Sequence, residues 1–132
     1  MSVSINRDKL ILTLPYPPTA NNLFINAGRR RVKSDEYKAW IALAEGVLMS
    51  QIPTLRRAGI KTRFEGEFHY TLTAIRPDRR RRDIDNLNKA TLDFLKSSGV
   101  IEDDCLTKTL FNQWSDDAPR AADVTVTLES AS

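Results

Sequence analysis

The segment RPDRRRRDIDNLNKATLDFLK, residues 76–96, joins the densest positive charge of the chain to a pair of carboxylates. Its second half predicts a helix, because apolar side chains recur there at helical spacing. These side chains are Ile84, Leu87, Thr91, Phe94 and Leu95. Asp83 or Asp85 can cap the start of this helix, and Gly99 is a typical stop after Ser98. The segment therefore predicts a strand-to-helix junction crowded with charge.

The flanking sequence predicts the rest of the fold. Residues 9–14, 63–75, 107–115 and 122–130 have the β-branched content or the alternation of strands. Residues 34–52 predict a first helix, with Ser34 as its N-cap. Residues 15–22 are proline-rich and predict a stiff loop, and residues 26–33 predict a flexible basic loop. The order β-α-β-α-β-β indicates an α+β fold, one domain over residues 1–132, with two helices on a mixed sheet of about four strands.

Composition excludes several classes of protein. The chain has 132 residues and a formal net charge of +3, but its charge is segregated, since residues 29–33 carry four positive side chains and no negative one. Cys105 is the only cysteine, so no intrachain disulfide can form, and with a single His a structural zinc site is not expected. No apolar run reaches the length of a membrane span and no secretory signal is present. We expect a soluble cytoplasmic protein.

The acidic residues suggest a metal site. Asp83 and Asp85 lie two apart, so both carboxylates could reach one cation if the backbone is extended there. Lys89 follows one turn later, and the sequence GVIEDD at residues 99–104 supplies three more acids. Carboxylates suit Mg²⁺, which keeps several waters, and basic walls suit a phosphodiester. The alternative is a helix cap with surface ion pairs at 83–85 and a solvated turn at 102–104.

Four other side chains have weaker claims to function. His69 is expected on the surface or packed against the sheet, and Cys105 is expected to pack inside because no base accompanies it. Trp40 and Trp114 are expected in the core, although Trp114 could instead contact a base or a second subunit.

Three stretches together resemble the RusA family of Holliday-junction resolvases: LPYPPTANN at 14–22, RPDRRRRDIDNLNKATLDFL at 76–95 and GVIEDD at 99–104. The similarity extends over roughly residues 10–128. It implies a homodimeric endonuclease that depends on Mg²⁺, for which Mn²⁺ could substitute, and that nicks four-way DNA junctions symmetrically.

The resemblance also implies site residues. The family's metal-binding acids fall on Asp83, Asp85 and Asp104, with Asp103 as the alternative to Asp104, and its essential lysine falls on Lys89. Its basic segment for DNA falls on Arg76, Arg79, Arg80, Arg81 and Arg82. Family members often carry a basic residue where this chain reads LFIN, residues 23–26. We expect the nearby basic residues to take over that contact with DNA, namely Arg29, Arg30, Arg31 and Lys33.

Two other functions fit part of the sequence. A non-catalytic module that binds junctions or DNA would use the basic segments but leaves the acids unexplained. A metal-dependent phosphotransferase would use Asp83 and Asp85 but not the arginines. Dependence on Mg²⁺ separates the three, because the module binds DNA without it and the phosphotransferase ignores DNA.

Overall fold

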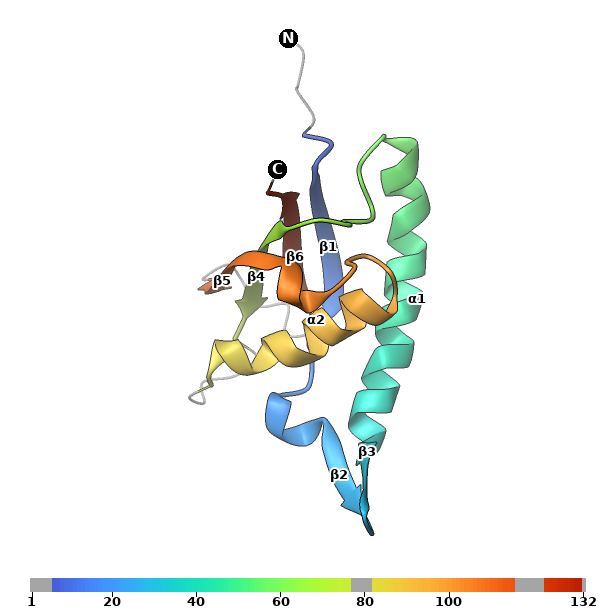
Figure 1. Cartoon of the computed structure of the whole chain (residues 1–132), viewed down its shortest axis with the longest axis vertical. Coiled ribbons are helices and arrows are strands. Elements are labelled where there is room, and N and C mark those ends of the chain that lie inside the picture. The colour runs from blue at the N-terminus through green and yellow to red at the C-terminus, as the bar shows by residue number, and fades with distance from the viewer. Residues whose placement is uncertain (1–5, 77–81, 116–122, 132) are drawn as a thin grey trace.

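The four long strands form one mixed sheet in the order β1-β6-β4-β5 (Figure 1). Their bounds are Lys9–Pro15 for β1, Phe68–Ile75 for β4, Thr107–Ser115 for β5 and Asp123–Ser130 for β6. Strand β6 is antiparallel to both β1 and β4, whereas β5 is parallel to β4. The computed structural model describes residues 6–76, 82–115 and 123–131. The predicted α+β class and four-stranded sheet are confirmed.

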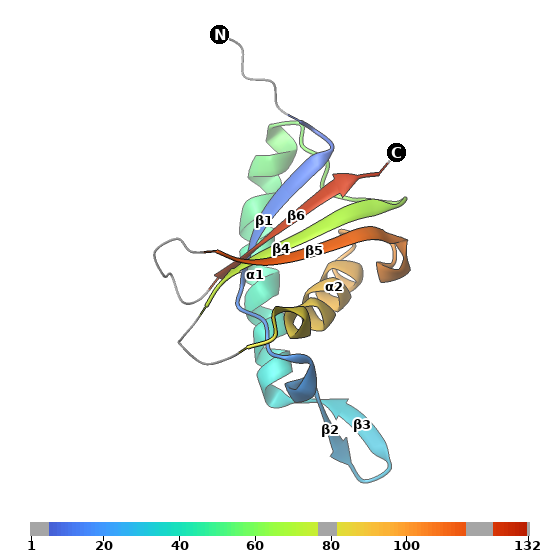
Figure 2. The same ribbon diagram turned by 90° about the vertical axis from the view of Figure 1, so that its left-hand side faces the viewer.

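One face of the sheet is covered by helices α1, Asp35–Arg57, and α2, Asn88–Ser97 (Figure 2). Alternation along the strands produces this face, because every second residue points to it. The buried side chains of β1, β4 and β6 are those of Leu10, Leu12, Leu14, Phe68, Tyr70, Leu72, Ala74, Val124, Val126 and Leu128. Strand β4 begins later than predicted, since Phe64 makes only an isolated bridge to Ile101.

Helix α1 begins as predicted and ends later. The Ser34 hydroxyl accepts a hydrogen bond from the Tyr37 amide at 3.1 Å, which confirms the N-cap. The sequence predicted an end near residue 52, directly before Pro53, which has no amide to donate. The helix nevertheless continues to Arg57, where the backbone amide of Ala58 still bonds to Thr54. Ile52 and Leu55 pack against the core on either side of the proline, and this packing offsets the lost hydrogen bond.

The second helix begins later than predicted. A short 3₁₀ turn, Ile84–Leu87, precedes α2, and Asp83 stands before it in extended backbone with no side-chain capping bond. Neither Asp83 nor Asp85 therefore caps α2, whose first residue is Asn88. The end of the helix is as predicted, because Gly99 has a φ of +81°, a conformation that favours glycine.

The segment predicted as a flexible basic loop is a β-hairpin instead. Strands β2, Phe24–Ala27, and β3, Arg30–Lys33, pair antiparallel, and Gly28 with a φ of +66° opens the two-residue turn. The Arg31 guanidinium lies 4.5 Å from the centre of the Phe24 ring, a contact that side-chain charge alone did not reveal. The hairpin projects from the body of the molecule (Figure 1).

The two outer edges of the sheet differ. The Gln51 side chain of α1 bonds to both backbone groups of Thr13 in β1, at 2.9 and 2.8 Å, and so occupies that edge at Thr13. On β5, Leu110 and Phe111 are 47% and 57% exposed.

Neither helix in the described part of the chain has the length and apolar character needed to span a membrane.

We predict opposite effects on stability for two glycine-to-alanine changes. Gly99→Ala should lower the free energy of unfolding by about 1–2 kcal/mol, because alanine is strained at positive φ. Its Cβ would also meet Arg63 Nη1 at 3.3 Å. Gly46→Ala, inside α1 with open space around the new methyl, should raise stability by about 0.5–1 kcal/mol. Urea denaturation of both variants measures this, and equal shifts would contradict the assigned backbone at Gly99.

Candidate functional site

Three of the predicted site residues lie together in sequence at the beginning of α2. Asp83 is in extended backbone, Asp85 is in the 3₁₀ turn and Lys89 is in the first turn of the helix. All three side chains are exposed. The condition that residues 83–85 are extended is not met, so alternation along a strand does not align the two carboxylates. The Asp83 carboxylate comes from extended backbone, and the Asp85 carboxylate comes from the 3₁₀ turn that follows it.

A buried amide network fixes this end of α2 to the sheet. The Tyr70 hydroxyl of β4 donates to Asn88 Oδ1 at 3.0 Å. The Asn88 and Asn112 side chains exchange two hydrogen bonds, at 2.7 and 2.9 Å. Burial raises the pKa of Tyr70, so this hydroxyl keeps its proton and remains a donor. Asn88 is thereby fixed to the sheet, and it lies directly between Lys89 and the turn that carries Asp85.

Asn88 was not predicted as a site residue, although its position in the helix indicates that its side chain is buried. Asn88 falls on the apolar stripe of the helix, four residues after Ile84 and three before Thr91, where a polar side chain is buried and needs partners. Thr91 is also buried and donates its hydroxyl to the carbonyl of Leu87 at 2.9 Å.

Lys89 has a partner that the sequence analysis also missed. Its ammonium lies 3.1 Å from Asp93 Oδ2, one helical turn further on. Burial, and then the charge of Asp93, raise the pKa of Tyr37 on α1. Asp93 thus faces both Lys89 and the first helix, and it draws the lysine ammonium along α2, away from Asp85.

The acids after Gly99 lie at the opposite end of α2. Asp103 Oδ2 is 3.3 Å from the Lys96 ammonium, and Asp103 Oδ1 accepts from the Cys105 amide at 3.0 Å. The pKa of Asp103 lies below its usual range, chiefly because its carboxylate accepts the hydrogen bond from the Cys105 amide. Asp104 opens the 3₁₀ turn Asp104–Leu106, directly before β5. The predicted packing role of Cys105 is wrong, since its side chain is exposed.

The length of α2 separates the two sets of acids within one chain. The helix rises about 12 Å between Asn88 and Lys96. The register of the sheet agrees, because Asn88 bonds to Asn112, far along β5 from Asp104. Over residues 6–76, 82–115 and 123–131, no three His, Cys, Asp or Glu side chains gather closely enough to hold a metal ion. The donors are hard carboxylate oxygens, which suit Mg²⁺, but one chain does not gather all of them.

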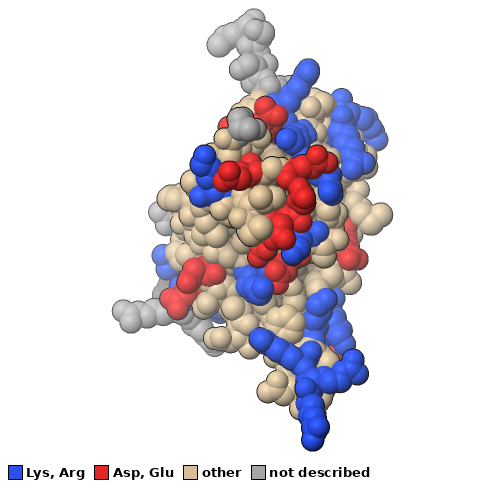
Figure 3. Space-filling model, in the orientation of Figure 1, with Lys and Arg blue, Asp and Glu red and all other residues tan. Residues whose placement is uncertain are grey.

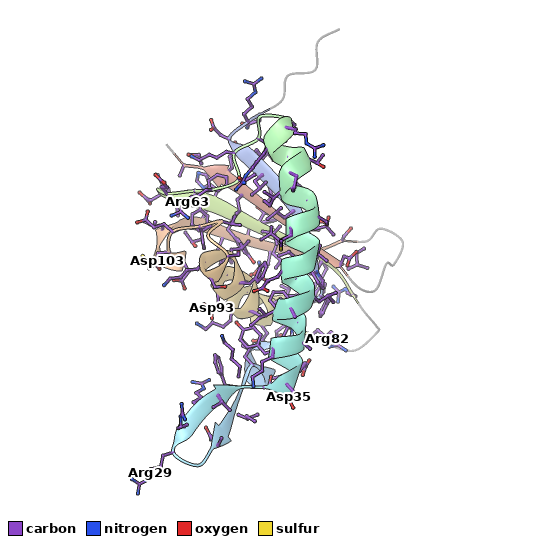
Figure 4. All side chains as sticks on the ribbon, turned by 90° about the vertical axis from the view of Figure 1, so that its right-hand side faces the viewer. Arg29, Asp35, Arg63, Arg82, Asp93 and Asp103 are labelled. Carbon is purple, nitrogen blue, oxygen red and sulfur yellow. The ribbon has the colours of Figure 1, made fainter. Side chains whose placement is uncertain are left out.

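The basic side chains form a separate region. Lys and Arg gather at the lower end of Figure 3, where Figure 1 places the hairpin, and Figure 4 shows Arg29 at its tip. The hairpin carries Arg29, Arg30, Arg31 and Lys33, all exposed. Arg76 lies over the Trp114 ring at 5.2 Å. Arg79, Arg80 and Arg81 fall outside the described residues.

Three remaining aromatic or titratable side chains have structural contacts. Trp40 is buried and donates its Nε1 hydrogen to the Pro15 carbonyl at 3.0 Å, as a core residue does. Trp114 is only partly buried, in contrast to the expected core position. His69 Nδ1 lies 2.6 Å from the Thr109 hydroxyl on the neighbouring strand, which agrees with a role on the sheet.

Comparison with known proteins identifies the family. A family model described as endodeoxyribonuclease RusA matches residues 15–128 and so includes both ends of α2. The chain belongs to the RusA endodeoxyribonuclease family. Crossover junction endodeoxyribonuclease RusA of Escherichia coli K12 is 33% identical over 94 residues, which cover 70% of this chain and 72% of that protein. The enzymes of the same name from Enterobacteria phages 82 and HK97 are 33% and 35% identical over 94 residues, covering 70% and 69% of this chain and 72% and 70% of theirs.

The RusA match covers all the sequence stretches on which the resemblance rested except Leu14. It includes the proline-rich loop, the acidic beginning of α2 and the turn before β5. Membership agrees with the resemblance predicted from the sequence and confirms an endodeoxyribonuclease. The roles of individual RusA-family residues in this chain remain predictions.

We predict that Asn88 and Tyr70 are coupled in stability. Asn88→Ala should lower the free energy of unfolding by about 1–3 kcal/mol, because it leaves the buried Tyr70 hydroxyl without its acceptor. In the background of Tyr70→Phe, the same change should cost less. Urea denaturation of the single and double variants measures the coupling. Additive losses would show that the hydrogen bond contributes nothing.

Proposed function

We propose that this chain is a Mg²⁺-dependent endonuclease that resolves four-way DNA junctions by paired symmetric nicks. The observation that carries the proposal is the family match across the anchored beginning of α2, where Asp83, Asp85 and Lys89 are exposed together. The relatives carry the name crossover junction endodeoxyribonuclease, which supports a branched DNA substrate.

The side chains have distinct roles in the proposed reaction. Asp83, Asp85 and Asp104 would hold the cation, which would supply Lewis-acid polarisation of the scissile phosphate and lower the pKa of a coordinated water. Lys89 lies one turn beyond Asp85 and would stabilise the charge that develops on the phosphate. In this structure the Lys89 ammonium bonds to Asp93, one turn further from Asp85, and it would turn back toward the phosphate when DNA binds.

Asp104 suits the role of the third ligand better than Asp103. The Asp103 carboxylate already bonds to Lys96 and to the Cys105 amide, and both contacts fix it within the turn. A carboxylate committed in this way gives up stabilising contacts when it binds a cation. Of the two neighbouring aspartates onto which the family's third acid can be aligned, Asp104 is therefore the better candidate.

A second copy of the chain would bring the separated acids together. The edge of β1 is occupied at Thr13 by Gln51, whereas β5 exposes Leu110 and Phe111. If two β5 strands pair antiparallel, the beginning of one lies beside the end of the other. Asp104 precedes β5, and the beginning of α2 is bonded to Asn112 near its far end. Pairing would therefore move Asp104 of one copy toward Asp85 of the other.

The basic hairpin would hold the DNA arms. Arg29, Arg30, Arg31 and Lys33 project from the body on a paired and therefore ordered strand pair (Figure 4). Contacts of this kind bind phosphates without reading sequence, and their strength falls as salt rises. Arg76 and Arg82 would add phosphate contacts of their own, and the family resemblance implies the same role for the arginines at 79–81. A non-catalytic DNA-binding module would use the same surface but has no use for exposed carboxylates beside a phosphate path.

We predict that cleavage of a labelled four-way junction requires Mg²⁺ and Asp85. Wild-type protein should make paired symmetric nicks with Mg²⁺ and none with EDTA. Asp85→Asn should slow nicking at least about a hundredfold, because it removes one negative ligand oxygen. Asp8→Asn, an exposed acid at the N-terminal end of the sheet, is the matched control and should cut normally. Tight binding without nicking by the wild type would favour the non-catalytic module.

We also predict that two inactive variants restore cleavage when mixed. Asp85→Asn and Asp104→Asn should each be inactive alone. After the subunits exchange, a mixed dimer would have one intact shared site, so nicks should appear singly at about a quarter of the wild-type rate. Asp103→Asn should retain activity when tested alone. No restored nicking in subunits shown to exchange would mean that each site lies within one chain.

A further inference from the structure

Two adjoining cavities form a groove between the proline-rich loop and the approach to α2. The first has a volume of about 320 Å³ and the second about 220 Å³. Tyr16, Thr19 and Arg82 line both, so the cavities adjoin at these side chains. Trp40 and Glu36 of α1 line the first cavity, and Asp83 lines the second. The groove thus leads from the first helix to a proposed metal ligand.

The wall formed by the proline-rich loop is rigid. Pro15, Pro17 and Pro18 are buried and their rings fix the backbone. Trp40 holds the loop through its bond to the Pro15 carbonyl at 3.0 Å. The Asn22 carbonyl accepts from the Ser34 hydroxyl at 2.6 Å, which ties the end of the loop to the beginning of α1. A wall that is ordered before binding loses little conformational entropy when a ligand enters.

The lining suits a planar aromatic ligand with polar edges. Tyr16 is partly buried and offers a ring face, whereas Trp40, Pro17 and Pro18 are buried and contribute apolar edges to the lining. The Thr19 hydroxyl accepts from Asn22 Nδ2 at 3.1 Å, so its own proton can be donated to a ligand. Glu36 supplies an acceptor, and Arg82 supplies a cation that can stack or bind phosphate. Nucleobases combine a flat π face with donor and acceptor edges in this way.

We propose that the groove binds one nucleobase, unstacked from the strand whose phosphate lies at Asp83, and that this base sets the sequence preference of cleavage. The inference rests on the proposed nuclease function, because it takes Asp83 to mark the path of the cut strand. Bases at a branch point are the easiest to unstack, since their neighbours on one side are interrupted. A base in the groove would also hold the adjoining phosphate beside Asp83.

The test is a binding scan with abasic junctions. Asp85→Asn protein is incubated with Mg²⁺ and with four-way junctions that lack one base, at each position around the branch point in turn. Loss of one base should weaken binding about tenfold at a single position on each cut strand and little elsewhere. In Tyr16→Leu and in Thr19→Trp, which fills the groove, that position should no longer matter. Tyr16→Phe keeps the ring and should keep the effect. Thermal unfolding checks that each variant is folded.

The outcomes separate this inference from the nuclease function. If wild-type protein nicks junctions but no single abasic position weakens binding, the base pocket is wrong and the nuclease function stands. A position effect that persists in both Tyr16→Leu and Thr19→Trp would also overturn the pocket. If the wild type nicks nothing, the nuclease function fails, yet a position effect lost in both variants still establishes a base site. Absence of junction binding overturns both.

Discussion

The Asn88 side chain is the constraint on which the arrangement of the proposed site depends. It is 8% exposed and bonds to residues of two strands, Tyr70 of β4 and Asn112 of β5. A buried amide is costly unless its donors and acceptors are satisfied, so only a narrow range of positions for the helix meets the requirement. Apolar packing by Phe94 and Leu95 holds α2 on the sheet, but the amide contacts select where along β5 it begins.

Much of the fold could be predicted from the sequence because its signals are local. The alternation in β4, the Ser34 cap and the stop at Gly99 depend on neighbours in the chain, and all three are confirmed. The hairpin at residues 24–33 and the extension of α1 beyond Pro53 were missed. Both depend on contacts made in three dimensions, such as Arg31 on the Phe24 ring and Ile52 against the core.

The candidate site shows a similar division. The identity of the acids and of Lys89 was evident from the motif, and the family match includes them. Their positions were not evident, because a motif gives order along the chain and not the distance between the ends of a helix. Asp83 and Asp85 lie at one end of α2 and Asp103 at the other, beside Lys96. Asp93 was missed, although its spacing of four residues from Lys89 on the predicted helix is the signal of an ion pair.

The Gln51 contacts with Thr13 have a consequence for how far such an assembly can grow. A sheet with two open edges can add copies without limit, and this is the geometry of fibres. Here an amide from α1 occupies the backbone groups at the middle of one edge, at 2.8 and 2.9 Å. If β5 of one copy pairs with β5 of a second copy, the open edge of each sheet is used in that contact, and the pair is closed. In such a pair, the Gln51 contacts would hinder a further strand from joining at Thr13, and the sheet would then stop at two copies.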